Sequence, residues 1–267
     1  MERTEVLAQL LGVLHAYDDE NGLFLVCPDK LAFGVLASPL SGGDDSTASK
    51  LNLLLSLAWP DDTLIQVCCY TSPDMVGITT AYEDLRAGVR NSLLRRSTQE
   101  HVKFIRKSAL EPYDPVSGAR LRNSQLIITV QMPFKGVEPN EHTVELAREL
   151  RASFMQTLKS ANVYAETLTA RGYIRIMETI LNQGKTAAWK KTPLVDYDAN
   201  ELICTQVLDP GSAVDVDENG LWLNGSTRVR VLSPKRYPDA PYFGLALRYL
   251  IDPEHGARGI RENTLIT

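Results

Sequence analysis

The chain has 267 residues, of which 44% are hydrophobic and 23% are charged, a balance typical of a globular protein that builds a buried core. Single cores begin to divide at about this length, so one large domain or two smaller ones are expected. Acidic residues number 33 and basic residues 28, and the resulting net charge of −5 excludes a general attraction to nucleic acid or anionic lipid.

Cysteine usage and hydropathy favour a cytoplasmic protein. The four cysteines include the adjacent pair Cys68 and Cys69, and no C-x-x-C pair occurs, so free thiols and no metal site are expected. No apolar run approaches the roughly 20 residues of a transmembrane helix. The apolar stretch at residues 10–14 is also too short for the core of a signal peptide.

The first part of the chain predicts strands and a helix in alternation. Residues 22–40 contain two β-rich runs separated by a Pro-Asp pair, which indicates a hairpin. Asp44 or Asp45 can cap the helix that follows, and Pro60 ends it. Residues 63–72, TLIQVCCYTS, are apolar and β-branched over a strand's length and form the clearest predicted strand.

The same alternation continues through the middle of the chain. A helical segment is expected at residues 77–107, an alternating strand at 124–132 and a long amphipathic helix at 140–161. A further strand at 162–169 and a helix at 173–182 follow. Together these elements predict an α+β fold, a ferredoxin-like split βαβ arrangement with a mixed sheet and helices packed on it.

The pattern changes after residue 183. Short apolar runs are separated by Asp-Pro-Gly and Glu-Asn-Gly turns, which predicts a small β-rich lobe over residues 184–267 beside an α+β lobe over residues 1–183. A short helix is expected at residues 244–251, and the final ENTLIT has the pattern of a beginning strand. The apolar runs are residues 201–208, 213–216, 221–225 and 226–233.

One tripeptide, Gly184-Lys185-Thr186, is similar to the end of a phosphate-binding loop, G-x-x-x-x-G-K-[ST]. The first glycine of that motif would fall on Thr179, and the tripeptide follows a predicted helix instead of opening one. We interpret Gly184 as a helix C-cap. The sequence contains no Walker B strand, no G-x-S-x-G elbow and no metal-ligand spacing, so no catalytic, cofactor-binding or metal-binding residue is predicted.

Residues 86–107 form a basic stretch in this acidic chain. Seven basic residues accompany one acid, Glu100, which gives a local charge of +6. Such a stretch can contact anionic lipid, DNA phosphate or an acidic protein surface, or it can be a solvated helix face. Its single aromatic residue, Phe104, argues against a platform for stacking unpaired bases. The candidate contact region comprises Arg86, Arg90, Arg95, Arg96, Lys103, Arg106 and Lys107.

Three segments of the N-terminal half are distinctive: YDDENGLFLV, LAFGVLASPLSGGDDS and WPDDTLIQVCCYTSPDM, at residues 17–26, 31–46 and 59–75. They resemble segments of the TraC-type ATPases of conjugative type IV secretion systems, which are relatives of the VirB-class motor ATPases. The segment VRVLSPKRYPD, at residues 229–239, is similar to a family segment that precedes the motor domain.

The resemblance implies that the chain corresponds to the N-terminal domain of such an ATPase, with the Walker motifs, ATP and Mg expected only in a motor domain beyond it. It implies a non-catalytic assembly and docking domain, cytoplasmic and peripheral to the inner membrane, in a protein that serves DNA transfer and pilus assembly. The implied partners are other inner-membrane components of the secretion system, with self-association of the full-length protein.

Two other interpretations of the sequence stay open. A stand-alone soluble enzyme can assemble its active site, for example a pair of carboxylates, from separate segments that leave no local motif. A DNA-contacting module is favoured by the basic stretch and opposed by the net charge of −5.

Overall fold

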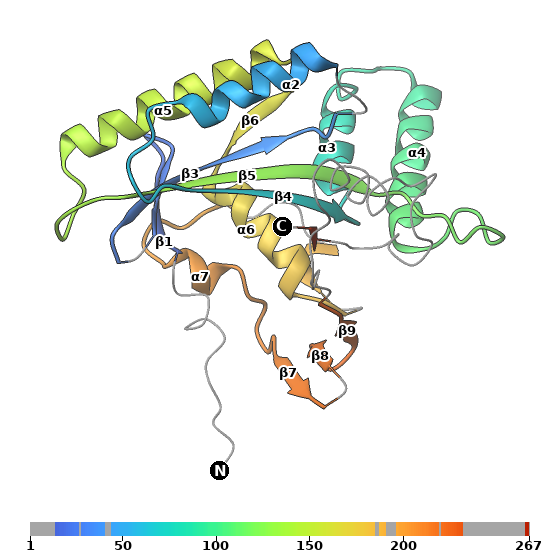
Figure 1. The fold of residues 1–267 in the computed structure, drawn as a ribbon. Coiled ribbons are helices and arrows are strands. Elements are labelled where there is room, and N and C mark those ends of the chain that lie inside the picture. The colour runs from blue at the N-terminus through green and yellow to red at the C-terminus, as the bar shows by residue number, and fades with distance from the viewer. Residues whose placement is uncertain are drawn as a thin grey trace.

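The computed structural model describes residues 14–26, 28–40, 44–184, 187–190, 196–218 and 220–231, and the backbone of residues 265–266. These residues form one large antiparallel sheet with helices on both faces and a second, small sheet near the C-terminal end (Figure 1). The predicted α+β class is therefore confirmed. Among the described residues, no helix combines the length and apolar character needed to cross a membrane.

The large sheet has seven strands in the order β1-β2-β3-β5-β4-β10, and β6 pairs with β3 on the edge that β3 shares with β2. Every pair in it is antiparallel, so the prediction of a mixed sheet is wrong for the described strands. The reason is that each helical crossover joins two strands that are not neighbours, and an oppositely directed strand takes the place between them. The strands are β1 (Leu14–Asp18), β2 (Leu23–Val26), β3 (Lys30–Ala37), β4 (Leu64–Ser72), β5 (Asn123–Pro133), β6 (Ala165–Leu168) and β10 (Leu265–Ile266).

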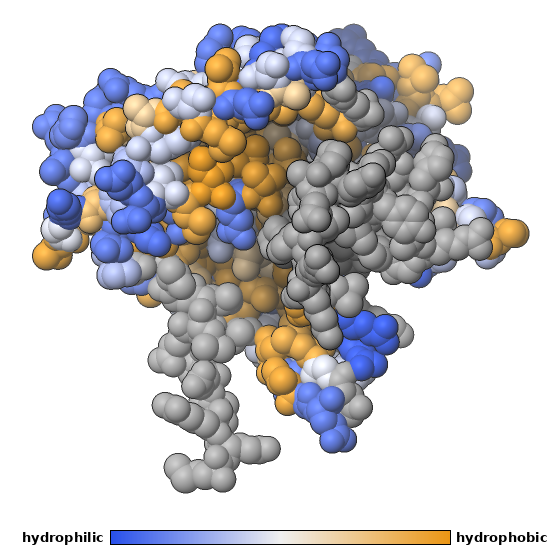
Figure 2. All heavy atoms as spheres, viewed as in Figure 1, coloured by the Kyte–Doolittle hydropathy of each residue, from blue (hydrophilic) through white to orange (hydrophobic). Residues whose placement is uncertain are grey.

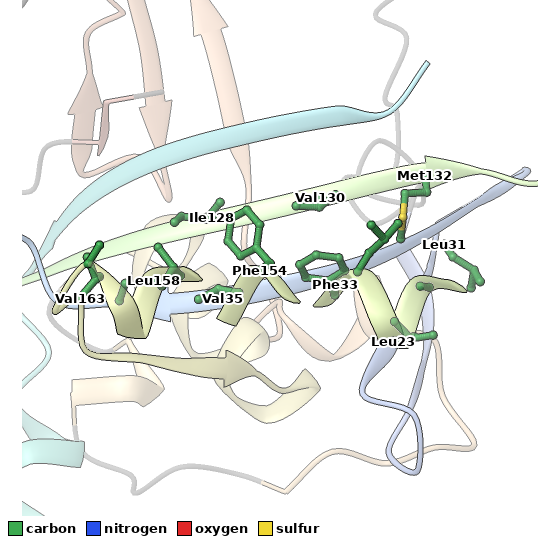
Figure 3. Packing of buried hydrophobic residues seen from close by; sticks show 14 of the residues in the cluster. Leu23, Leu31, Phe33, Val35, Ile128, Val130, Met132, Phe154, Leu158 and Val163 are labelled. Carbon is green, nitrogen blue, oxygen red and sulfur yellow. The ribbon is translucent and has the colours of Figure 1, made fainter. Parts of the chain in front are cut away.

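One face of the sheet packs against α5 (Glu141–Ser160), beside which lie α2 (Asp45–Asn52) and the short helix η1 (Leu53–Ser56) (Figure 1). Phe33 and Val35 point to this face because alternate residues of a strand share a side. Figure 3 shows Phe154 of α5 among them, and its ring centroid lies 5.8 Å from that of Phe33. The fully buried side chains of this cluster form the main core of the molecule.

The opposite face packs against α6 (Ala170–Leu181). Ile174 and Ile176 of this helix lie in two apolar clusters, which also contain Phe24 of β2 and Tyr70 of β4. The intervening residues of β3, such as Ala32, contribute to this side. The central strand β3 is thus packed on both faces, which explains why it is apolar from Leu31 to its end.

Helix α2 begins with a cap predicted from the sequence, and α5 begins where the sequence places its start. The Asp44 carboxylate accepts a hydrogen bond of 2.7 Å from the Thr47 amide at the start of α2. The Asn140 side chain accepts one of 2.8 Å from the Thr143 amide at the start of α5. Each cap satisfies an amide that has no partner inside its helix, so both boundaries follow from local chemistry.

The single helical segment expected at residues 77–107 is instead two helices, α3 (Val76–Asp84) and α4 (Ser92–Leu110). The Asn91 side chain begins α4 by accepting hydrogen bonds from the amides of Leu93, at 2.9 Å, and Leu94, at 3.4 Å. A new cap within the basic stretch therefore divides it between the α3–α4 connection, which holds Arg86 and Arg90, and α4.

The C-terminal part contains the predicted β structure and one unpredicted helix. Strands β7 (Val214–Asp217), β8 (Gly220–Leu223) and β9 (Thr227–Val229) form the small antiparallel sheet. Residues 201–208, expected as a strand-like run, instead contain α7 (Ile203–Gln206). Ile203 and Val207, one helical turn apart, are buried in the cluster that contains Tyr17 and Phe24. That packing favours a helix because it places both apolar side chains on one face.

Two other predictions concern the same region. The final segment does form a strand, since Leu265–Ile266 pairs antiparallel with Tyr70 and Cys69 at the edge of the large sheet. The helix expected at residues 244–251 lies outside the described residues. Gly184 follows the end of α6 with a φ of 110°, a backbone conformation that favours glycine. Lys185 and Thr186 also lie outside the described residues.

Candidate docking surface

The α3–α4 hairpin contains the whole basic stretch. It is inserted between β4 and β5, which are direct neighbours in the sheet and pair over the full length of β4. Because β4 and β5 pair directly with each other, the hairpin does not separate them but lies at one end of the sheet. It is to the right in Figure 1, with α3 and α4 side by side. Its base is at the sheet, and its connection, residues 85–91, lies at the opposite end.

The base of the hairpin is fixed by a buried ion pair. The Arg175 guanidinium of α6 donates to both oxygens of Asp74, with Nε 2.6 Å from Oδ2 and Nη2 3.2 Å from Oδ1. Nη2 also donates to the Trp189 carbonyl at 2.7 Å. The two charged side chains are only 7% and 13% exposed. A bidentate pair in this environment sets the position of the residues that lead into α3.

A second acid shares this arginine. The carboxylate of Glu178, one turn after Arg175, lies 3.5 Å from Nη1 and is also buried. Burial raises the pKa of Glu178 above its ordinary value, although the nearby guanidinium acts in the opposite direction. Removal from water therefore outweighs the attraction to Arg175 at this carboxyl.

The two helices are held together by Arg106 of α4. Its Nε donates a 2.8 Å hydrogen bond to the Thr79 hydroxyl of α3, and its Nη2 lies 3.4 Å from the Glu83 carboxylate. Thr79 is fully buried and donates its own proton to the Met75 carbonyl at 2.7 Å. Arg106 therefore has a structural role within the hairpin, although the sequence groups it with the candidate contact residues.

Two lysines of the candidate region also have acidic partners on α4 or at its end. Lys103 forms a salt bridge of 2.9 Å with Glu100, and Lys107 one of 3.6 Å with Glu111. Both pairs are exposed, so each lysine remains accessible but its charge is largely offset. The part of α4 near the sheet therefore contributes little net positive charge.

The remaining arginines lie at the outer end of the hairpin. The Arg86 guanidinium lies 3.7 Å from the centroid of the Tyr82 ring, a cation–π contact that leaves its charge unneutralised. None of the described acidic side chains forms a salt bridge with Arg90, Arg95 or Arg96, and all three arginines are exposed. The fold thus concentrates the uncompensated positive charge of the stretch at one place.

Three leucines lie beside these arginines. Leu85, Leu93 and Leu94 are 84%, 73% and 56% exposed, values that are unusual for large apolar side chains. Figure 2 shows hydrophobic and hydrophilic residues intermixed at this outer end of the hairpin. We define the hairpin tip as Leu85, Arg86, Arg90, Leu93, Leu94, Arg95 and Arg96.

Sequence reasoning identified the arginines of the tip but missed the leucines. The signal was present in the run Asn91-Ser-Leu-Leu-Arg-Arg, where two leucines follow a helix-capping asparagine directly. Apolar residues in the first turn of a helix are covered by a neighbouring helix only if that neighbour extends as far as this first turn. Here α3 ends at Asp84, so the leucines remain uncovered.

A hollow of about 300 Å³ lies on the sheet face beside α6. Its wall includes Phe24, Gly34, Gln66, Thr129 and Tyr173, and among the described residues that line it there is no Asp, Glu, His, Lys or Arg. Burial raises the pKa of the Tyr173 hydroxyl, which makes it a weaker acid near neutral pH. The described residues also contain no group of three or more potential metal ligands. The hairpin tip is therefore the better candidate for a functional surface.

The α+β fold with its projecting basic hairpin can be compared with known proteins. A family model described as TraC protein matches residues 7–267, nearly the whole chain. The chain belongs to this family, which is linked to conjugative type IV secretion, and the resemblance noted in the sequence is thereby confirmed. No curated protein matches the chain.

Proposed function

We propose that this chain acts as a non-catalytic assembly and docking domain in conjugative type IV secretion, with the hairpin tip as its contact surface. The observation that carries the proposal is the segregation of charge on the hairpin. Arg106, Lys103 and Lys107 have partners within the fold, whereas the arginines of the tip face solvent beside uncovered leucines. Membership in the TraC protein family supplies the biological setting.

The proposal assigns no catalytic residue to this chain. Gly184, the glycine of the G-K-T tripeptide, follows the end of α6, whereas a phosphate-binding loop leads from a strand into a helix. We therefore place ATP and Mg in a separate motor domain of the full-length protein. On this account the present domain influences nucleotide turnover only through attachment and subunit contacts.

We further propose a cytoplasmic location, peripheral to the inner membrane. The partners would be other inner-membrane components of the secretion system, together with further copies of the full-length protein. A positively charged, partly apolar tip on an acidic chain supports this location, because it provides local attraction to a negative surface while the rest of the molecule is repelled.

The fold proposal is a ferredoxin-like split βαβ unit within the larger sheet. It is supported by two strand–helix–strand segments, β3-α2-β4 and β5-α5-β6, in which β5 lies between β3 and β4, and β6 pairs with the other edge of β3. Residues 1–183 would form this α+β lobe and residues 184–267 the smaller β-rich lobe. The insertion of α3 and α4 between β4 and β5 would then be the element that adapts a common scaffold to docking.

Charge reversal at the tip tests the docking function. In the full-length protein, Arg95→Glu with Arg96→Glu is expected to reduce both association with secretion-system components, measured by affinity capture, and conjugation frequency, measured by mating. Each reversal replaces attraction by repulsion at an exposed site, so a loss of at least about tenfold is expected. Thermal unfolding is expected to be unchanged because both side chains are exposed.

The matched control reverses two basic residues outside the hairpin, Arg148→Glu with Lys159→Glu on α5. It changes net charge by the same amount and is expected to leave association and conjugation intact. Equal effects of the two double variants would contradict a local contact surface. Nucleotide hydrolysis by residues 1–267 alone would contradict the non-catalytic assignment, and tight, salt-sensitive DNA binding lost in the tip variant would favour the DNA-contacting alternative.

A further inference from the structure

The hairpin tip combines two features that have different requirements in solution. Exposed leucine side chains are unfavourable in water, and Leu85, Leu93 and Leu94 remain exposed although each could have been polar without affecting the described core. The neighbouring arginines are stable in water but attract anions. A binding partner that uses the whole tip must therefore accept apolar side chains and supply negative charge.

The backbone at the tip adds to the positive field. Helix α4 has no acidic residue in its first turn, where acidic side chains usually offset the partial positive charge of a helix N-terminus. Arg95 and Arg96 follow directly after that turn. The acids nearest in sequence are Asp84 at the end of α3 and Glu100, one turn after Arg96, which forms its salt bridge with Lys103, so positive charge predominates among the described residues of the tip.

We infer that the hairpin tip binds the surface of an anionic bilayer, with its leucines entering the headgroup region and its arginines contacting lipid phosphates. This inference rests on the proposed docking function and names the contact partner of the same site. A convex tip at the end of a helical pair suits a bilayer, because the interface accepts apolar side chains without requiring a complementary groove. Nucleic acid would use the arginines but leave the leucines exposed to water.

The fold makes such binding one-sided. The tip is the end of the hairpin opposite its base at the sheet, and it lies level with α2 and α5 in this view, so this side of the molecule would face the bilayer (Figure 1). The net charge of the chain is −5 in spite of the tip, so the remaining surface is repelled by the same lipids. The domain would therefore be held in one orientation, with the small β7–β9 sheet away from the membrane (Figure 1).

Vesicle binding tests the inference directly. The probe is a vesicle of phosphatidylglycerol and phosphatidylethanolamine, with a phosphatidylcholine vesicle as the neutral reference, and binding of the chain is measured by co-sedimentation. The chain is expected to bind the anionic vesicles at least about tenfold more tightly than the neutral ones, with affinity falling as salt rises. Equal affinity for both vesicles would overturn the inference.

Two sets of variants separate charge from insertion. Arg90→Gln, Arg95→Gln and Arg96→Gln together are expected to lower affinity for anionic vesicles by at least about tenfold, because each arginine contributes electrostatic attraction. Leu93→Ser with Leu94→Ser is expected to lower it to a similar degree without removing charge, because apolar insertion is lost. The control Arg148→Gln with Lys159→Gln on α5 is expected to bind as the parent does.

A single reporter distinguishes insertion from adsorption. Leu93→Trp places an indole at the tip, and its fluorescence maximum is expected to shift to shorter wavelength with anionic vesicles and not with single-stranded DNA. An unchanged maximum at saturating vesicles would mean that the leucines do not enter the bilayer, and the inference would be wrong. The parent tryptophan signal is subtracted with the unsubstituted chain.

The outcomes also separate this inference from the proposed function. If the Arg95 and Arg96 variants lose affinity capture of secretion components but the parent does not bind anionic vesicles, the tip docks on protein and the lipid inference fails alone. If the parent binds anionic vesicles and the variants do not, yet capture and conjugation are unaffected, the lipid inference holds and the tip is not the docking surface proposed above.

Discussion

At the scale of single residues, Asp74 and Arg175 connect the candidate surface to the core. Their bidentate ion pair lies where the chain leaves β4 and enters α3. The Arg175 guanidinium also donates a hydrogen bond to the Trp189 carbonyl. Because both side chains are nearly inaccessible to water, removing Arg175 would leave Asp74 uncompensated, and removing Asp74 would leave Arg175 with only the more distant carboxylate of Glu178, 3.5 Å from Nη1. The orientation of the hairpin therefore depends on residues that lie outside it.

Replacing one member of this pair is expected to be strongly destabilising. Asp74→Asn keeps the volume but removes the negative charge, and the free energy of unfolding measured in urea is expected to fall by about 3–5 kcal/mol. The control is Glu145→Gln, which removes the acid of an exposed pair with Arg148, and a change below about 1 kcal/mol is expected there. If Asp74→Asn behaves like the control, the pair does not contribute to stability as its burial implies.

Glu178 predicts a specific pH dependence of stability. Burial raises its pKa in the folded state above the value it has in the unfolded chain, so the folded state binds the proton more tightly. Its contribution is fully present below the unfolded pKa and is lost as pH rises through the folded pKa. Glu178→Gln removes this loss, so relative to the parent the variant is expected to become more stable as pH rises from the ordinary glutamate pKa of about 4.3 through the raised pKa of the folded state. Urea unfolding of both proteins across that range measures it, and a constant difference would contradict the assignment.

At the scale of elements, the antiparallel pairing of β3 with β6 leaves no room for a side chain at Gly34, which lies opposite Leu168. A Cβ atom there would lie 2.8 Å from Cδ2 and 2.9 Å from Cβ of Leu168, closer than packed carbons allow. Gly34→Ala is expected to lower the free energy of unfolding by about 1–3 kcal/mol, because the core must shift to accept the methyl group. Gly88→Ala in the α3–α4 connection is the control, since a Cβ atom added there would meet no described atom within 4 Å beyond its chain neighbours. If Gly34→Ala and Gly88→Ala lowered the free energy of unfolding by similar amounts, the close contact with Leu168 would not be the cause of the loss at Gly34.

Elements whose boundaries are decided by local chemistry could be predicted from the sequence. The strand expected at residues 63–72 is Leu64–Ser72, and the helix expected after Pro139 begins with an Asn140 cap. Residues 201–208 were predicted incorrectly because their helix depends on contacts with β1 and β2, nearly two hundred residues earlier. The strand order could not be predicted for the same reason, since pairing is decided by packing between segments distant in sequence.

The candidate surface shows the same division between local and distant information. The basic stretch and its seven members could be read from the sequence. Which of them are neutralised could not, because Thr79 and Glu83, the partners of Arg106, lie on another helix. Arg95 and Arg106 contribute equally to a charge count. In the fold, however, Arg95 faces solvent and Arg106 lies between α3 and α4.

At the scale of the whole molecule, the position of the hairpin depends on contacts made away from its tip. α5 packs on one face and α6 on the other, and the charged contact from Arg175 reaches the hairpin base from α6. The tip makes none of the core contacts of these layers. Substitutions at the tip are therefore expected to alter binding while the fold persists, which is the premise of the variants proposed above.

The place of β5 between β3 and β4 has a consequence for synthesis on the ribosome. Phe33 and Val35 pair in register with Val130 and Ile128, so the middle of the sheet is open until β5 has emerged. The α3–α4 hairpin is translated during that interval and can form early from its own contacts, since Thr79, Glu83 and Arg106 all lie within it. The nascent chain thus carries its outward-facing leucines before the interior of the domain has closed.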